Sequence, residues 1–475
     1  MDKASNHKFK IVSLFSGAGG MDLGFEMIGK FQLLFANDIL LSSAQTYSLN
    51  FDLEIIDMKK NGSFSLNGNP VYLVGDVSKL DFENLELEDV DLIIGGPPCQ
   101  DFSVVRGPER ERQGIGVYRG RLYAHFIRAL IRVQPKVFVF ENVPGLLSAN
   151  RGSAFRVILE DFSKLNFRWN EIKNIVGNNF NKNIRNYKVI FSGIVDSANF
   201  GVPQRRKRLL IIGIREDFFK SFKIDKTELV LYVKNTLEGK NSILSKYPLT
   251  PLEVFEGLPL PDLSNHYKLI MKEYSDIVTH IKTKFAIDWR KKFYDSLSLD
   301  VVDDYLMLNN IIPHNKNEVE KAFEEHWKIL NELDYYGNKV EGKLFPDGSN
   351  RLPEESEKVL ERLKMIPPGE NYLFVKETKW KVEGRGMSLI YRRLHPLKPA
   401  YTVVAYGGGG TWGYHYKRHR GRLTNRERAR LQTFPDWFLF KGNTSEMRAQ
   451  IGEAVPPLLG KKIAEIVDTI LGFGR

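Results

Sequence analysis

The sequence contains a single cysteine whose surroundings could support covalent chemistry. Cys99 follows the run Gly95-Gly96-Pro97-Pro98 and precedes Gln100. The two prolines restrict the backbone that leads to the thiol, and the segment comes directly after an apolar run at 92–94. A lone cysteine is more often a small buried apolar residue than a nucleophile. A polar Gly/Pro-rich loop at the end of a strand favours the nucleophile, which is the reading we adopt.

A carboxyl group and a cluster of cations occur in the same part of the chain. Glu141 ends a second apolar run at 137–140, and residues 204–208 read Gln-Arg-Arg-Lys-Arg. The basic run by itself is equally typical of a solvated turn. If thiol, carboxyl and arginines meet at one sheet edge, they predict nucleophilic addition with delivery of a proton.

A glycine loop and two acids predict a cofactor with a nucleoside part. The loop reads Phe15-Ser16-Gly17-Ala18-Gly19-Gly20, and its glycines allow a ligand to approach the backbone closely. Asp22 stands where the dinucleotide fingerprint would place a glycine, which disfavours a nicotinamide cofactor. Asp38 and Asp76 each end an apolar run, where a carboxylate can bind ribose or an adenine edge. The loop without the acids would be equally compatible with an ordinary tight turn.

Alternating elements must position these residues. Short apolar runs, which suit strands buried on both faces, occur at 11–15, 33–36, 72–74, 92–94, 137–140 and 209–212. Apolar residues at helical spacing lie between them, at 122–131 and 155–165. The alternation predicts a doubly wound, mostly parallel α/β sheet, in which ligands bind beyond the carboxyl ends of the strands.

The pattern changes after residue 215. Charged helical stretches such as 319–330 and proline-rich breaks such as 367–369 indicate a second, smaller α+β domain. Strand-like runs at 389–391 and 401–406 adjoin glycine-containing turns, and an apolar helix resumes near 456. We therefore expect a catalytic and cofactor-binding domain at 1–215, a second domain at 216–421 and a return segment at 422–475.

Composition limits the possible functions. The 475 residues include 69 Lys and Arg against 58 Asp and Glu, a net charge of +11 that permits a polyanionic partner. One cysteine rules out internal disulfides and a multi-cysteine zinc site, and His415 with His419 lacks a third ligand nearby, so no metal is expected. No apolar run is long enough to span a bilayer and the first ten residues are polar, which predicts a cytoplasmic protein without membrane attachment.

Taken together, the motifs resemble the DNA (cytosine-5) methyltransferase family of bacterial restriction-modification systems. They are FSGAGG at 15–20, ND at 37–38, GDV at 75–77, GGPPCQDFS at 95–103, ENVPG at 141–145, QRRKR at 204–208, RLTNRERARLQTFPD at 422–436 and GEAVPP at 452–457. They occur in the family's order. The resemblance implies the fold of S-adenosylmethionine-dependent methyltransferases, with the second domain as the target-recognition domain.

The resemblance also implies roles for single residues. S-adenosylmethionine would be bound by Phe15, Gly17, Gly19, Gly20, Asp38, Asp76, Val77, Pro97, Leu122, Glu453 and Val455. Cys99 would attack carbon 6 of a flipped cytosine, Glu141 would hold a proton toward ring nitrogen 3, and Arg206 and Arg208 would steady the ring oxygen and the carboxylate. The chain departs from the family's pattern at Glu453, where Asn is usual, and at Asn425, where Pro is usual.

For DNA, the resemblance places paired glycine-containing loops against base edges. We expect contacts from Gln100, Ser103, Arg106, Arg385, Arg392, Arg393, Thr402, Tyr406, Arg418 and Arg420, with residues 101–120 as a lid over the flipped base. The cationic stretch 415–430 is equally typical of arginines that pair with acids inside the fold.

The predicted activity is therefore methylation of cytosine carbon 5 in a specific double-stranded DNA site, by a monomer that shares this site with a restriction endonuclease. The same chemistry on tRNA is an alternative, which the large second domain disfavours. A non-catalytic DNA-binding protein on the same scaffold is another alternative, disfavoured by Cys99, Glu141 and the arginine run.

Overall fold

The computed structural model describes residues 8–59, 69–82, 85, 87, 89–98, 122–176, 183–382, 390–406 and 413–474. The chain forms two compact units. The first comprises Met1–Asp196, Lys207–Asn241 and Pro457–Arg475, and the second comprises Ser197–Arg206 and Ser242–Pro456. Residues 197–206 and 422–456 thus group with the middle of the chain, whereas the functional domains expected from sequence end at 215 and 421.

One eight-stranded sheet forms the first unit, in the order β3-β4-β2-β1-β5-β6-β9-β7. β9 is antiparallel to both of its neighbours, and the other pairs are parallel. The mostly parallel sheet predicted from sequence is confirmed. The strands are β1 (Phe9–Leu14), β2 (Phe31–Asp38), β3 (Glu54–Asp57), β4 (Val71–Val74), β5 (Leu92–Gly95), β6 (Val137–Asn142), β7 (Tyr187–Asp196) and β9 (Lys207–Arg215).

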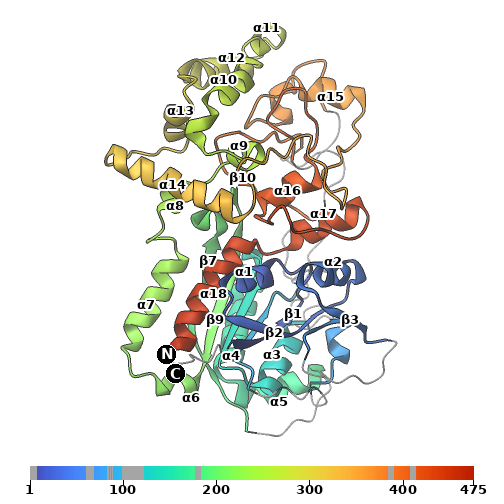
Figure 1. Ribbon diagram of the computed structural model, residues 1–475, viewed down its shortest axis with the longest axis vertical. Helices are drawn as coiled ribbons and strands as arrows, with labels where there is room; N and C mark the ends of the chain where they lie inside the picture. The colour runs from blue at the N-terminus through green and yellow to red at the C-terminus, as the bar shows by residue number, and fades with distance from the viewer. Residues whose placement is uncertain are drawn as a thin grey trace, which may run out of the picture. The chain divides into compact units, whose positions relative to one another are not determined.

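Helices cover both faces of this sheet, as Figure 1 shows. Alternate residues of the central strands, such as Val12, Ile93 and Phe138, pack in one core with residues of α3, α4 and α5. Residues of the opposite face, such as Ala36 and Tyr72, pack with α2. Burial on both faces explains why these strands read as continuous apolar runs. The helices are α1 (Gly20–Ile28), α2 (Leu41–Phe51), α3 (Leu122–Val133), α4 (Ser153–Ser163), α5 (Leu165–Val176), α6 (Glu216–Ser221), α7 (Lys226–Leu237) and α18 (Pro457–Gly472).

The C-terminal helix α18 packs against α1 (Figure 1), and its residues group with the first unit. Two glycines allow this close approach. A Cβ atom on Gly24 would collide with the backbone of Gly460 and Lys461, and one on Gly460 would lie 2.6 Å from the Met21 carbonyl oxygen. Neither backbone can move away cheaply, so both positions require glycine.

The second unit is mostly helical. Its strands among the described residues are β8 (Gln204–Arg205) and β10 (Ala400–Tyr401), which pair in parallel. The strand expected over 401–406 therefore ends at Tyr401, because the next groups bind side chains and carbonyls of residues 204–205 instead. Ile390 and Tyr391 lie in a turn. The helices are α8 (Ile243–Lys246), α9 (Pro251–Glu256), α10 (Ser264–Lys272), α11 (Ile277–His280), α12 (Lys284–Lys292), α13 (Val301–Leu308), α14 (Lys316–Glu332), α15 (Glu357–Leu363), α16 (Asn425–Leu431) and α17 (Thr444–Glu453).

A buried ion pair joins α14 to α9 within the second unit. Nδ1 of His326 lies 2.8 Å from Oε1 of Glu253, and Nε2 lies 2.9 Å from the carbonyl oxygen of Tyr247. Both ring nitrogens therefore face acceptors, which only the protonated imidazole can satisfy with two N–H groups. Burial by itself would lower the pKa of His326, but the carboxylate and the carbonyl outweigh it and raise the pKa above 6.5.

We expect His326→Gln to lower the free energy of unfolding by about 3 kcal/mol near pH 6, because it leaves a buried carboxylate without its cation. A raised pKa in the folded state means that this stability is complete below pH 6.5 and is lost as the pH rises through the folded value. Urea unfolding at pH 6 and pH 9 should therefore show a smaller difference at pH 9. His280→Gln, which removes an exposed histidine paired with Asp276, is the control. An equal loss at both pH values would contradict the charged pair.

Candidate active site

The carboxyl ends of the parallel strands bring the predicted residues of the first unit to one edge. The chain leaves β1 toward β2 on one side, whereas β5 and β6 lie on the other side of β1. Such a switch in strand order opens a crevice beyond the strand ends, where ligands bind in α/β sheets. Asp38 ends β2 and Glu141 is the penultimate residue of β6. The glycine loop, Asp76 and residues 96–98 follow β1, β4 and β5.

The glycine loop takes the left-handed backbone that its sequence predicts. Gly17 has φ +53° and Gly19 has φ +86°, and Gly19 precedes the first residue of α1. A Cβ atom on Gly17 would meet nothing within 4 Å, so open space lies above the loop at this residue. A Cβ atom on Gly19 would lie 2.7 Å from the ring of Tyr47. The first glycine therefore leaves room for a ligand, and the second is required by packing.

Two side chains from neighbouring strands fix the position of Gly17. Its amide donates to Oδ2 of Asp38 at 3.0 Å, and its carbonyl oxygen accepts from the hydroxyl of Tyr72 at 2.9 Å. Oδ1 of Asp38 accepts from the amide of Leu40 at 3.1 Å. Burial raises the pKa of Asp38, although these amides counteract it. Asp38 thus orients the loop, a role that the spacing alone did not predict.

A buried acid, Asp22, supports the glycine loop from the side of α1. Oδ1 of Asp22 accepts from the hydroxyl of Tyr47 at 2.9 Å, and the Tyr47 ring is the one that contacts Gly19. Burial raises the pKa of Asp22 to about 6, against the hydrogen bonds from Ser13 and Tyr47 that lower it. Asp22 therefore supports the ring on which the loop rests.

An apolar surface beside Asp38 was missed by sequence reasoning. Ile39, Leu40 and Leu41 follow β2 directly, and their side chains are 64%, 43% and 53% exposed. Three consecutive large apolar residues at the end of a strand, next to an open glycine loop, suit the flat face of a base. The signal was available in the sequence as an apolar run that continues past the acid.

Asp76 begins the short helix Val77–Lys79, whose Ser78 amide donates to the Asp76 carboxylate at 2.9 Å. Arg128 of α3, which sequence reasoning also missed, donates to the Val77 carbonyl oxygen at 2.6 Å. His125 on the same helix is buried, and desolvation and the charge of Arg128 lower its pKa to about 4. The second acid is thus held at the same edge as the glycine loop.

Glu141 and Arg208 form an ion pair at the end of β6. Nε of Arg208 lies 2.9 Å from Oε1 of Glu141, and both side chains are only 12% exposed. A Cβ atom on Gly96 would lie 2.7 Å from Oε2 of the same carboxylate. Asn142 donates to the carbonyl oxygen of Pro97 at 3.1 Å. The segment that leads to Cys99 therefore passes directly over the Glu141 carboxylate.

Arg206 has different contacts from Arg208. It is fully buried in the second unit and donates to the carbonyl oxygens of Val403 and Gly452 at 2.9 Å, and to that of Glu453 at 3.4 Å. This pattern favours a structural role, and its role toward a substrate stays a prediction. Glu453 is exposed and Val455 is buried, both in the second unit, and their contact with a cofactor also stays a prediction.

Several predicted DNA contacts are engaged within the second unit. Arg393 is fully buried and donates to the carbonyl oxygens of Leu363 and Lys417. Arg418 pairs with Asp276 at 2.5 Å, and Arg420 pairs with Glu341 at 2.9 Å and with Glu427 at 2.7 Å. These three arginines therefore match the alternative in which the basic stretch pairs with acids and carbonyls, although their DNA contacts remain predictions.

The remaining predicted DNA contacts differ in exposure. Thr402 donates to the Arg205 carbonyl oxygen at 2.8 Å, the guanidinium of Arg392 lies on the Tyr401 ring, and Tyr406 is 63% exposed. The predictions on Cys99, Gln100, Ser103, Arg106, Arg385 and the lid 101–120 lie outside the described residues. Within the described ranges no group of His, Cys, Asp and Glu could hold a metal ion, and no helix has the length and apolar character to cross a membrane.

Comparison with known proteins identifies the family of the chain. The model of the C-5 cytosine-specific DNA methylase family matches residues 9–468. A relative named DNA (cytosine-5-)-methyltransferase M.ApeKI, from Aeropyrum pernix, is 52% identical over 465 residues, which cover 98% of this chain and 99% of the relative. The type II methyltransferase M.NgoFVII of Neisseria gonorrhoeae is 31% identical over 469 residues, which cover 98% of this chain and 88% of that relative.

A solved structure of a prophage-encoded E. coli protein, named as a DNA modification methyltransferase, matches the fold with a TM-score of 0.53 at 22% identity. The match covers 98% of this chain and 100% of that chain. The chain therefore belongs to the C-5 cytosine-specific DNA methylase family. The prediction of an enzyme of the DNA (cytosine-5-)-methyltransferase class is confirmed.

The raised pKa of Asp22 gives a test of the loop's support. Because the folded pKa of about 6 exceeds the ordinary 3.8, ionisation destabilises the fold as the pH rises through this interval. Between pH 4 and pH 8 the wild type should lose about 2.5 kcal/mol of unfolding free energy relative to Asp22→Asn, which keeps an acceptor for Tyr47. Urea unfolding at several pH values measures this difference. The control is Asp52→Asn, at the exposed end of α2, whose unfolding free energy should change with pH in parallel with that of the wild type. If Asp22→Asn also ran parallel to the wild type, the raised pKa of Asp22 would be refuted.

Proposed function

We propose that the protein transfers a methyl group from S-adenosylmethionine to carbon 5 of a flipped cytosine in a specific double-stranded DNA sequence, through a covalent adduct with Cys99. The observation that carries the proposal is the Glu141–Arg208 pair beneath Gly96, in the segment that leads to Cys99. A carboxyl group so placed can deliver a proton to a base that is bound beside this segment, as addition with proton delivery requires.

The residues around the glycine loop fit S-adenosylmethionine. Open space above Gly17 leaves room for the ligand to approach the backbone, and the exposed apolar side chains of Ile39 and Leu40 offer a surface for adenine. Asp38 and Asp76 supply carboxylates for the ribose and the adenine amino group. When bound, S-adenosylmethionine supplies an electrophilic methyl group. Phe15, Gly19, Gly20, Val77, Pro97, Leu122, Glu453 and Val455 complete the proposed cofactor contacts.

The chain's own residues make the cytosine reactive. Carbon 5 of an aromatic cytosine is a poor nucleophile, and addition of the Cys99 thiolate to carbon 6 turns it into an enamine-like one. Electron density then moves to ring nitrogen 3, where Glu141 provides a proton. Arg208 holds the Glu141 carboxyl group and the ring oxygen. Loss of the proton from carbon 5 of the methylated adduct returns the electron pair that expels the thiolate.

The same chemistry requires that the target base be accessible to the thiol. A base inside a duplex is out of reach of a thiol, so the cytosine is flipped out of the stack. We assign DNA binding to the second unit, and we expect a cytoplasmic monomer that acts as the modification enzyme of a restriction-modification system. Bisulfite sequencing of DNA from expressing cells reports the methylated base and its sequence together.

In the presence of S-adenosylmethionine, we expect wild-type protein to form a covalent complex, stable in denaturant, with duplex DNA that contains 5-fluorocytosine at the methylated position. The analogue lacks the carbon 5 proton whose loss releases the thiol, so the adduct persists. Cys99→Ser should form none, and gel electrophoresis after denaturation separates the two outcomes. The same assay with tRNA tests the alternative substrate. An adduct with Cys99→Ser would overturn the assigned nucleophile.

Substitutions of Arg206 and Arg208, two of the three arginines in the 204–208 run, should have different effects. Arg208→Gln removes the partner of Glu141, so we expect about a 100-fold loss in the single-turnover methylation rate with a nearly unchanged melting temperature. Arg206→Gln removes buried donors from three carbonyl oxygens, so we expect about 3 kcal/mol lower unfolding free energy. Rates at 20 °C and thermal unfolding measure both. The reverse pattern would assign the substrate role to Arg206.

A further inference from the structure

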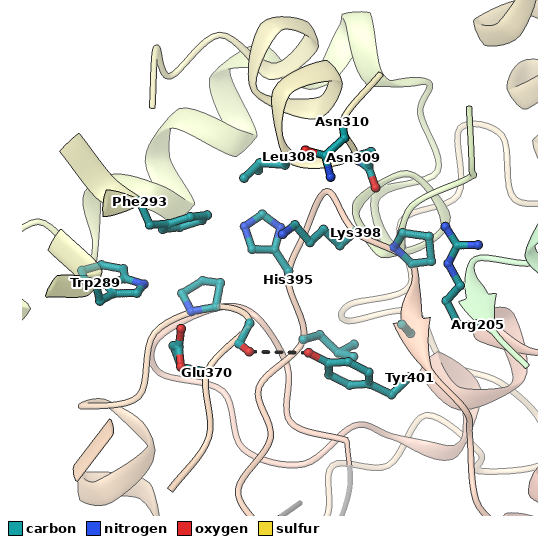
Figure 2. Close-up of a pocket in the computed structure, with 15 residues that line it drawn as sticks. Arg205, Trp289, Phe293, Leu308, Asn309, Asn310, Glu370, His395, Lys398 and Tyr401 are labelled. Carbon is teal, nitrogen blue, oxygen red and sulfur yellow. Dashed lines mark hydrogen bonds between the residues drawn. The ribbon is translucent and has the colours of Figure 1, made fainter. Parts of the chain in front are cut away.

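The second unit contains a cavity of about 360 Å³ that the proposed function does not use. This volume lies in the range of ligand pockets, about 300–1,000 Å³. Figure 2 shows Trp289 and Phe293 at one end of the cavity, Arg205 at the other, and His395 and Lys398 between them. We call it the His395 pocket. All of its lining residues belong to the second unit, so the cavity does not depend on the first.

His395 offers this pocket a buried hydrogen-bond donor without a partner. The side chain is only 5% exposed, and its Nδ1 accepts from the amide of Leu397 at 3.0 Å. Because Nδ1 accepts, the ring proton resides on Nε2, and Nε2 is buried without a hydrogen-bond partner. Burial and the charge of Lys398 lower the pKa of His395 to about 3, so the ring is neutral. An unsatisfied buried donor costs stability, and a ligand acceptor would offset that cost.

The walls of the pocket separate into an aromatic part and a cationic part. Trp289 and the adjacent Phe293 have ring centroids 6.0 Å apart, and the Phe293 ring meets the His395 ring edge to face at 5.8 Å. Lys398 and Arg205 are both exposed at the rim. Glu370 faces the same cavity, and burial raises the pKa of its carboxyl group, which favours the form that can donate a hydrogen bond.

The combination of aromatic walls, a neutral donor and cations at the rim disfavours both an inorganic anion and a purely apolar ligand. An inorganic anion would leave the aromatic walls and the neutral His395 donor unexplained. A purely apolar molecule would leave the unpartnered Nε2 and the exposed cations unexplained. A planar heterocycle with ring nitrogens and carbonyl oxygens can stack on aromatic side chains and accept from a neutral donor, and an attached phosphate suits lysine and arginine at the rim.

We propose that the His395 pocket binds one nucleotide, with its base toward Trp289 and Phe293, an acceptor of the base on Nε2 of His395, and its phosphate toward Lys398 and Arg205. The nucleotide belongs either to a DNA strand, as an unpaired residue or a strand end, or to the free pool. The site goes beyond the proposed function, because it needs neither Cys99 nor the glycine loop. Nucleotide binding at the His395 pocket can therefore be observed even if the proposed methyl transfer is wrong, and methyl transfer can be observed even if this pocket binds no nucleotide.

Tryptophan fluorescence reports binding directly, since Trp289 lines the pocket. The four deoxynucleoside 5′-monophosphates are titrated into the full-length protein with saturating S-adenosylhomocysteine, which occupies the proposed cofactor site. We expect saturable quenching by at least one nucleotide. Inorganic phosphate and ribose 5-phosphate should produce none. Trp289→Phe should lose most of the quenching signal, whereas Trp327→Phe, which removes a tryptophan of α14 outside the pocket, should retain it.

Two further variants separate the donor from the cation. His395→Asn places an acceptor where Nδ1 stands, so it can keep the Leu397 contact while removing the Nε2 donor, and we expect about tenfold weaker binding. Lys398→Gln should reduce the preference for a nucleoside monophosphate over its nucleoside. Because Lys398 is exposed, this variant tests the site even if His395→Asn fails to fold, which circular dichroism and thermal unfolding check for each variant.

Oligonucleotides identify the source of the nucleotide. A duplex with one unpaired nucleotide and a fully paired duplex of the same flanks are compared by the same quenching. Quenching by the first alone supports a nucleotide of a DNA strand, and quenching only by mononucleotides supports a free nucleotide. No quenching by any nucleotide, an undiminished signal in Trp289→Phe, or equal quenching by inorganic phosphate would overturn the proposal.

Discussion

The antiparallel register between β6 and β9 fixes the ion pair on which the proposed chemistry depends. Glu141 pairs with Leu210 across the two strands, so Arg208, two residues before Leu210, is the diagonal neighbour on the same face. The ion pair between Glu141 and Arg208 follows from this register. A slip by one residue would turn Arg208 to the other face of the sheet and leave the carboxylate without its cation. The backbone pairing of two strands thus sets a contact on which the proposed acid–base chemistry depends.

The central strands of the sheet could be predicted from the sequence because their burial on both faces leaves a continuous apolar run in each of them. Each apolar run named within the first 215 residues forms a strand, since a strand buried on both faces must be apolar throughout. β3 and β7 lie at the two edges of the sheet. β3 has only exposed and half-buried residues, and β7 mixes exposed with buried ones, so neither produces a continuous apolar run. The direction of β9 was not predictable, because an apolar run has no sign that distinguishes parallel from antiparallel pairing. Asn425, which departs from the family's pattern, is the first residue of α16, where an amide needs no intrahelical partner and proline is tolerated as well.

The contacts of individual arginines could not be predicted from the sequence. The chain's positive charge and its dense basic stretch indicate a polyanionic partner, yet residues such as Arg393, Arg420 and Arg426 contact carbonyls and carboxylates of their own unit. A guanidinium is always charged, so its function depends on what faces it, and the facing groups come from distant parts of the chain. The run 204–208 contains both kinds of arginine. Arg206 is buried among carbonyl oxygens, whereas Arg208 forms an ion pair with the Glu141 carboxylate near the end of β6. Motif resemblance found both, and only geometry distinguishes them.

Each compact unit is discontinuous in sequence, and this has a consequence for biosynthesis. The second unit is complete once residue 456 has left the ribosome, whereas the first still lacks α18, whose backbone packs against α1 through Gly24 and Gly460. Domains generally fold as units during synthesis. The packing around α1 is therefore completed only after α18 has been synthesised, long after the strands of the same unit. Connectivity thus sets the order in which the two units can be completed during synthesis.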